Sequence, residues 1–193
     1  LISSDFSNSN LKNTQFHTSN LERSIFKNSN IENPIFISSN LKSADLSYLK
    51  LNNANFENSD LTYTNLSYTD LETSNFVKTK LYKTQLNNSD IENSNFFMSD
   101  IYESNFSNAN LNNSNFESSR LSNANFSNAN LSQANLLDIY PINSNFDRSD
   151  LTDSKINTCL EHDLFSRMIN KILRTLQNSN LSFLNTTLVN LCN

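Results

Sequence analysis

The sequence lacks glycine and tryptophan altogether, and its 193 residues include only two prolines, two histidines and two cysteines. The absence of glycine excludes the glycine-rich loops by which many nucleotide-binding proteins hold phosphate groups. Two cysteines, Cys159 and Cys192, are too few for a disulfide framework, so we expect a reducing, cytoplasmic location. The chain has no run of roughly 18 apolar residues, so the sequence predicts no membrane-spanning helix and no membrane partner.

Apolar residues are also scarce, at 36% of the chain, and a composition so rich in serine and asparagine is typical of disordered segments. Their spacing argues against disorder. In steps of five from position 1 to position 156, 31 of the 32 residues are Leu, Ile or Phe, and the exception is Pro141. Two places before each of these positions the residue is small, except at Pro34, Leu49 and Ile139.

A period of five matches neither a helix face, which returns every three or four residues, nor a flat strand face, which returns every two. It fits square coils in which each five-residue unit forms one side and four units make a coil of 20 residues. The longer period is visible because phenylalanine collects on two opposite sides and is absent from the other two. One side reads Phe16, Phe36, Phe56, Phe76, Phe96, Phe116, Leu136 and Ile156, and the opposite side reads Phe6, Phe26, Leu46, Leu66, Leu86, Phe106, Phe126 and Phe146.

The repeat (S/A)-(N/D)-(L/F)-x-x, clearest over 104–136, closely resembles that of the pentapeptide-repeat family, and the repeat region runs over 1–157. This resemblance implies an all-β solenoid, a right-handed quadrilateral β-helix. Without glycine, its corners must be turns that ordinary residues can adopt, and asparagine tolerates unusual backbone angles best. We expect a bulge or loop near 137–143, where Ile139 and Pro141 break the pattern.

After Asn157 the apolar period changes to three and four residues, which predicts an amphipathic C-terminal α-helix over 158–177. Five-residue phasing returns over 178–193, which either completes the same rod or stacks on a partner's rod. The apolar stripe of the helix is wide enough to meet another chain, so we expect a homodimer. The predicted interface consists of Leu160, Leu164, Phe165, Met168, Ile169, Ile172, Leu173 and Leu176.

No catalytic constellation is recognisable. Cys159 and His162 have metal-ligand spacing on one helix turn, but a zinc site needs two more ligands and Cys192 is the only further thiol. A nucleophile built from Cys159, His162 and Asp163 is disfavoured, because neighbours on one turn do not face each other. The sequence therefore predicts a protein that is not an enzyme, with no catalytic residues, no cofactor and no metal.

Negative charge is concentrated in the second half of the repeats. The net charge is −5, and residues 84–147 carry seven acidic residues against Arg120 alone. Four carboxylates on one side of the rod, Asp70, Glu72, Asp90 and Glu92, form what we call the acidic stripe. It is either a solvated face or a negative surface that imitates a phosphate backbone. The sequence has no basic patches interleaved with aromatic residues, which argues against direct nucleic-acid binding.

Several large side chains are also predicted to point outward. The adjacent Phe97 and Met98, one coil from Val77, are either ordinary surface residues or a contact with a partner. The outward tyrosines are expected to stack from coil to coil; they are Tyr48, Tyr63, Tyr68, Tyr82 and Tyr102.

Two functions remain open at this point. The first is a non-enzymatic, rod-shaped scaffold for protein interactions. The second follows from the resemblance, since the best-known members of the family are bacterial dimers, joined by C-terminal helices, that imitate duplex DNA. They bind DNA gyrase or topoisomerase IV, which are type II topoisomerases, and protect the enzyme from quinolones. We expect the scaffold because the acidity of this chain is only moderate.

Overall fold

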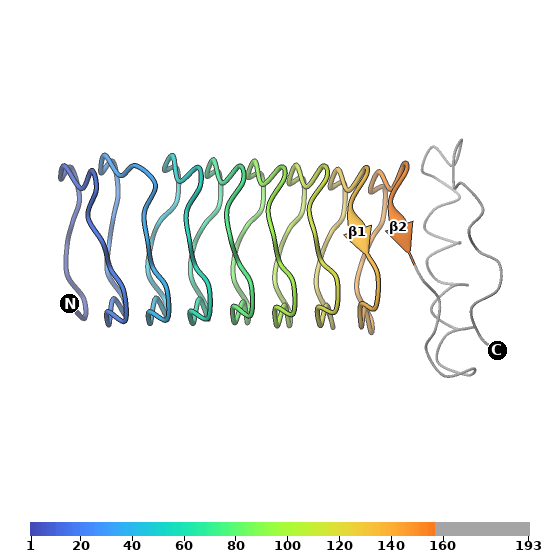
Figure 1. The fold of residues 1–193 in the computed structure, drawn as a ribbon, viewed down its shortest axis with the longest axis horizontal. Coiled ribbons are helices and arrows are strands. Elements are labelled where there is room, and N and C mark those ends of the chain that lie inside the picture. The colour runs from blue at the N-terminus through green and yellow to red at the C-terminus, as the bar shows by residue number, and fades with distance from the viewer. Residues whose placement is uncertain (157–193) are drawn as a thin grey trace.

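A computed structural model describes residues 1–156, which wind into a rod of stacked coils (Figure 1). Residues twenty apart in sequence pair in parallel, as Asp45 does with Asn65 and Asn65 with Gln85. Most pairs are single-residue bridges. The only strands in the described part are β1 (Asn135–Leu136) and β2 (Lys155–Ile156), which are parallel and pair with each other at the same twenty-residue offset. Strands stay this short because the chain turns every five residues.

Large apolar residues fill the centre of the rod, as the five-residue pattern predicts. The inward Leu, Ile and Phe side chains from Leu21 to Leu131 are at most 3% exposed. On the side rich in phenylalanine the rings stack between coils, with ring centroids 4.5 Å apart for Phe76 and Phe96 and 4.7 Å apart for Phe96 and Phe116. The core is therefore a continuous column one side chain deep, and neighbouring coils share its stability.

The small residues two places earlier also point inward. Where the residue is Ser or Thr, its hydroxyl commonly donates a hydrogen bond to a backbone carbonyl of the preceding coil. Thr84 Oγ1 bonds the carbonyl oxygen of Leu61 at 2.7 Å, and Ser114 Oγ bonds that of Ile91 at 2.9 Å. A buried hydroxyl is thus satisfied beside the apolar core, which explains why both Ser and Ala suit this position.

At every corner one residue has a left-handed backbone. The φ angle at these residues lies between 44° at Asn33 and 60° at Tyr48. Asparagine is common there, in line with the prediction. Tyrosine and the β-branched residues Thr18 and Thr73 occupy corners as well, which composition alone does not predict.

The bulge or loop expected near 137–143 is absent. Tyr140 pairs with Arg120 at the usual offset, and Asp138 keeps the left-handed corner with φ of 54°. In other repeats the central N–H donates to the carbonyl nineteen residues later, as Leu121 does to Tyr140. Pro141 lacks this N–H, yet Tyr140 and Asn145 on either side of it keep their bridges at the usual offset, and Ile139 stays half-buried against the core.

The pattern is interrupted earlier instead. Within residues 1–156, Asn30 forms no bridge with Lys50, although neighbouring repeats pair at that offset. Leu49 fills the small-residue position just before Lys50, and it is buried there. Pro34 lacks the N–H that donates the turn bond in other repeats, such as the bond from Ser24 to Leu21.

The C-terminal predictions concern a different part of the chain. The predicted helix over 158–177, the return to repeats over 178–193 and the dimer interface on that helix all lie outside the described residues. Within the described part, no helix is long and apolar enough to cross a membrane.

Candidate interaction surfaces

The acidic stripe forms on one side of the rod. Asp70 and Asp90 pair across two coils, which brings Glu72 and Glu92 into register beside them. The carboxylate oxygens of Glu72, Asp90 and Glu92 lie within 4.8 Å of one another. That spacing is close enough for a shared cation, although exposed acidic groups commonly cluster without one.

Carboxylates this close raise the cost of ionisation. The pKa of Glu72 is raised above its ordinary value, mainly by the charge of Asp90, then by Asp70, burial and Glu92. Asn110 Nδ2 offsets part of the charge by donating to Asp90 Oδ1 at 2.9 Å and to Glu92 Oε2 at 3.4 Å. Asp70 Oδ1 is buried and has no hydrogen-bond partner among the described residues. The stripe thus produces a concentrated negative potential, which attracts cationic groups.

A cluster of tyrosines lies on the opposite side, because its repeats are displaced by ten residues from those of the stripe. The rings of Tyr82 and Tyr102 are stacked, with centroids 5.3 Å apart and planes 6° apart, and Tyr63 meets Tyr82 edge-on at 5.7 Å. Lys83 Nζ sits 5.2 Å from the centre of the Tyr82 ring and pairs with Glu103 at 3.3 Å. The hydrogen bond to Glu103 is the main reason why the pKa of Lys83 is raised. These contacts hold the cluster in one geometry.

A second tyrosine pair stands at another corner. Tyr48 is 71% exposed, yet its ring stacks on that of Tyr68 at 4.9 Å with planes only 2° apart. Both pairs confirm the predicted stacking between coils. Among the outward apolar residues, Phe97 and Val77 are half-buried, whereas Met98 is exposed.

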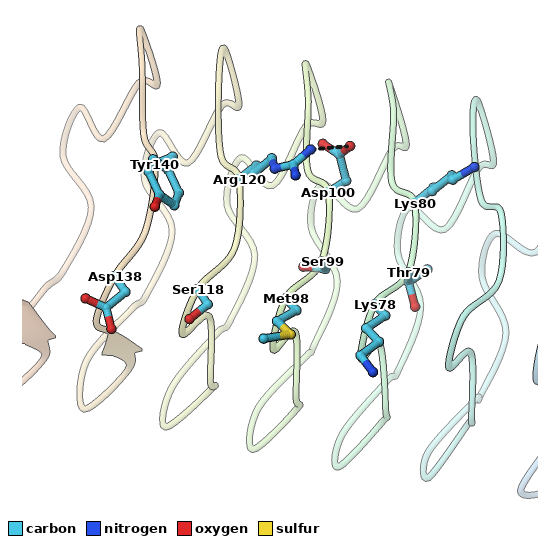
Figure 2. A pocket seen from close by; sticks show the side chains of 10 residues that line it. All are labelled: Lys78, Thr79, Lys80, Met98, Ser99, Asp100, Ser118, Arg120, Asp138 and Tyr140. Atoms are coloured by element: carbon cyan, nitrogen blue, oxygen red, sulfur yellow. Dashed lines mark ion pairs between the residues drawn. The ribbon is translucent and has the colours of Figure 1, made fainter. Parts of the chain in front are cut away.

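A shallow groove with a volume of about 580 Å³ runs along a corner of the rod (Figure 2). Two rows of side chains from successive coils border it, and Thr79 and Ser99 lie between the rows. One row is Lys78, Met98, Ser118 and Asp138, and the other is Lys80, Asp100, Arg120 and Tyr140. The groove is not evident from the five-residue pattern alone. Its residues align only in rows of twenty, which bring together 78–80, 98–100, 118–120 and 138–140.

Comparisons with solved structures find the same type of repeat at low identity. HetL, involved in heterocyst differentiation regulation in the cyanobacterium Nostoc sp. strain PCC 7120, is 18% identical over 81% of this chain and 76% of its own, with a TM-score of 0.46. A protein of the Arabidopsis thaliana thylakoid lumen is 22% identical over 57% and 70%, with a TM-score of 0.34. QnrB1, a plasmid-mediated fluoroquinolone resistance protein, is 15% identical over 94% of this chain and 97% of its own, with a TM-score of 0.37.

Family-level comparisons are more direct. A model described as pentapeptide repeats matches residues 1–33 and 39–76 with eight copies, and one described as a pentapeptide repeat region matches residues 89–163. None of the curated proteins compared matches the chain. Because these two matches span most of the repeats and agree with the coils of the structure, the chain belongs to the pentapeptide-repeat family.

Proposed function

We propose that this protein is a non-enzymatic scaffold that binds a protein partner through side chains fixed on the outside of a rigid rod. The observation that carries this proposal is the order of its exposed tyrosines. Tyr48 is 71% exposed and still stacked on Tyr68, and the exposed Tyr102 is stacked on the half-buried Tyr82. Exposed aromatic side chains held in place in this way suit recognition better than they suit solubility.

The physical reason is the entropy cost of binding. A flexible side chain loses roughly 0.5–1.5 kcal/mol when an interface immobilises it, and a side chain that is already ordered avoids most of that loss. Tyrosine also supplies a large contact area with few rotatable bonds. Stacking on the next coil has ordered these rings before any partner arrives.

An affinity capture from the source cell's lysate tests the scaffold. Full-length protein is compared with a variant carrying Tyr63→Ser, Tyr82→Ser and Tyr102→Ser, and with a control carrying Asn88→Ser and Asn108→Ser. We expect a partner that the wild type and the control retain and the tyrosine variant loses. Equal retention by all three, or no specific retention by the wild type, would contradict the proposal.

A second candidate, the DNA mimic, is favoured by the acidic stripe. Its four carboxylates span two coils of about 4.8 Å each, or one charge per about 2.4 Å, against one per about 1.7 Å of duplex DNA. The density is comparable, but Asn110 and Asn130 then take the stripe positions until Asp150. The stripe is short for a duplex mimic, which is why the scaffold is our first proposal.

Gyrase supercoiling distinguishes the second candidate. Wild type is compared with a variant carrying Asp70→Asn, Glu72→Gln, Asp90→Asn and Glu92→Gln, at low and high salt. A mimic inhibits supercoiling or lowers quinolone-induced cleavage, and the effect weakens with salt and in the variant. An inactive wild type rules out mimicry, and an equally active variant rules out the stripe as its site.

A further inference from the structure

The corner groove brings together three basic residues where the acidic second half of the repeats begins. Lys78 and Lys80 face it from one coil, and Arg120, the only basic residue in 84–147, faces it two coils later. Neither lysine forms an ion pair within residues 1–156. Both are exposed. Lys83, by contrast, is held by Glu103.

Charge in the groove is also unevenly distributed along the rod axis. The two lysines stand across from each other at one end, and Asp138 and Tyr140 border the other end (Figure 2). Between them, Arg120 Nη1 lies 3.8 Å from Asp100 Oδ2, a separation too long for a hydrogen bond. Arg120 is therefore able to turn to a better acceptor at small cost.

The floor of the groove adds shape but no free donors. Thr79 and Ser99 are buried, and the hydroxyl of Thr79 donates to the carbonyl of Phe56 at 2.8 Å. Apolar contact comes from Met98 and Tyr140, which are 50% and 47% exposed. An occupant must consequently meet the lysines with acidic groups and these two residues with apolar ones.

We propose that the groove binds an extended peptide segment of a partner protein, with acidic side chains at the Lys78–Lys80 end and apolar side chains against Met98 and Tyr140. Three coil steps of about 4.8 Å separate Lys80 from Tyr140, a span of about 14 Å that an extended chain covers with about five residues. Asp100 and Asp138 disfavour nucleic acid, because every phosphate carries a charge and some would face these carboxylates. This inference rests on the scaffold function and names the chemistry of one partner.

Fluorescence anisotropy with the full chain tests the groove. The probe is a peptide of two glutamates followed by leucine, serine and phenylalanine, labelled at its C-terminus, and the control peptide has glutamines in place of the glutamates. We expect the variant carrying Lys78→Glu and Lys80→Glu to bind the probe at least about tenfold more weakly than wild type, because attraction becomes repulsion. The glutamine peptide should bind wild type weakly.

A matched control separates local contact from overall charge. Lys27→Glu with Lys50→Glu makes the same change in net charge at two exposed lysines outside the groove, and we expect it to lower affinity less than about twofold. If circular dichroism shows that the groove variant is unfolded, Lys78→Gln with Lys80→Gln replaces it. Wild type that fails to bind the probe, a groove variant that binds as wild type does, or equal losses in both variants would overturn the groove proposal.

Two further results keep the inference distinct from the scaffold. If a single-stranded oligonucleotide of equal charge displaces the probe more effectively than the unlabelled peptide does, the groove is a nucleic-acid site and the peptide proposal is wrong. If lysate capture retains the same partner on wild type and on the groove variant, the scaffold stands and the groove proposal fails. If the wild type captures nothing from the lysate but binds the probe through the groove, the groove proposal stands and the scaffold proposal fails.

Discussion

One residue at every corner of the coil is held at a backbone angle that most side chains avoid. These residues have φ between 44° and 60°, and none of them is glycine. The left-handed region costs an ordinary residue roughly 1–2 kcal/mol, and β-branched side chains suffer most. Bridges to the coils on either side must offset this cost, as those of Asp70 and Asn75 do before and after the corner at Thr73.

Replacing Thr73 by asparagine should therefore stabilise the protein. Asparagine tolerates φ of 57° better than threonine, and the neighbouring corners Asn53 and Asn93 show that its amide fits this column. We expect Thr73→Asn to raise the unfolding free energy by roughly 1 kcal/mol in chemical denaturation. Ser107→Asn, one residue before a corner, where φ is not positive, is the control and should change little. A loss of stability in Thr73→Asn would mean that the corner is not strained.

Removing one ring from the core should have the opposite effect. Phe96 is fully buried between Phe76 and Phe116, whereas its neighbour Phe97 points outward and is half-buried. Phe96→Ala should lower the unfolding free energy by roughly 3–5 kcal/mol, because it leaves a cavity in the stack. Phe97→Ala should lower the unfolding free energy clearly less. Chemical denaturation of both variants measures the difference. Equal losses would show that the inward assignment is wrong.

The inward residues were predictable because a period of five assigns each position to the core or the surface without further information. Exceptions were harder to interpret. Pro141 and Ile139 interrupt the sequence pattern, but Tyr140 and Asn145 on either side of Pro141 keep their bridges. The actual interruption lies near Pro34 and Leu49. Predicting it requires knowing which positions donate the turn hydrogen bond, because Pro34 has no N–H to donate. The groove was missed because its residues are far apart in sequence and meet only through the twenty-residue stacking.

On each side of the rod, equivalent residues of successive coils are neighbours. Together they form a column along the rod. Columns of asparagine form ladders, as Asn115 Nδ2 donates to Asn95 Oδ1 at 3.1 Å. The acidic stripe is a column of the opposite kind, since its neighbours repel one another and raise the pKa of Glu72. A raised carboxyl pKa means that the folded state binds the proton more tightly, so its contribution to stability is lost as the pH rises through the folded pKa.

Glu72→Gln should therefore raise the melting temperature at pH 7, and less so at high salt. The gain should shrink as the pH falls through the raised pKa of Glu72, and it should be gone below about 4, where the carboxyl is protonated in the folded and the unfolded state alike. Thermal melts at both pH values measure it. Glu103→Gln is the control and should lower the melting temperature at pH 7, because it removes the partner of Lys83. A gain from Glu72→Gln that does not change with pH would contradict the repulsion.

The whole molecule presents different chemistry on its opposite sides. The acidic stripe occupies one side, and the cluster of Tyr63, Tyr82 and Tyr102 occupies the other, next to the groove. The two sides are related only through the shared core, so their relative placement is fixed only while the rod keeps its shape.

The predicted helix over 158–177 bears on how many rods act together. If it forms the expected interface, light scattering at high micromolar concentration should give twice the mass of the chain. Leu164→Glu with Met168→Glu should give the monomer mass, because charges on an apolar seam oppose association. A wild type of monomer mass would rule out the homodimer.

Spin-label distances test the rigid, twenty-residue coil most directly. With Cys159→Ser and Cys192→Ser as background, one label at position 3 is paired in turn with a label at position 103, 123 or 143, which are corners of the same side. The coil predicts narrow distributions centred near 24, 29 and 34 Å, because each coil adds about 4.8 Å. Broad distributions, or distances that do not grow by one coil step for each twenty residues, would contradict the account.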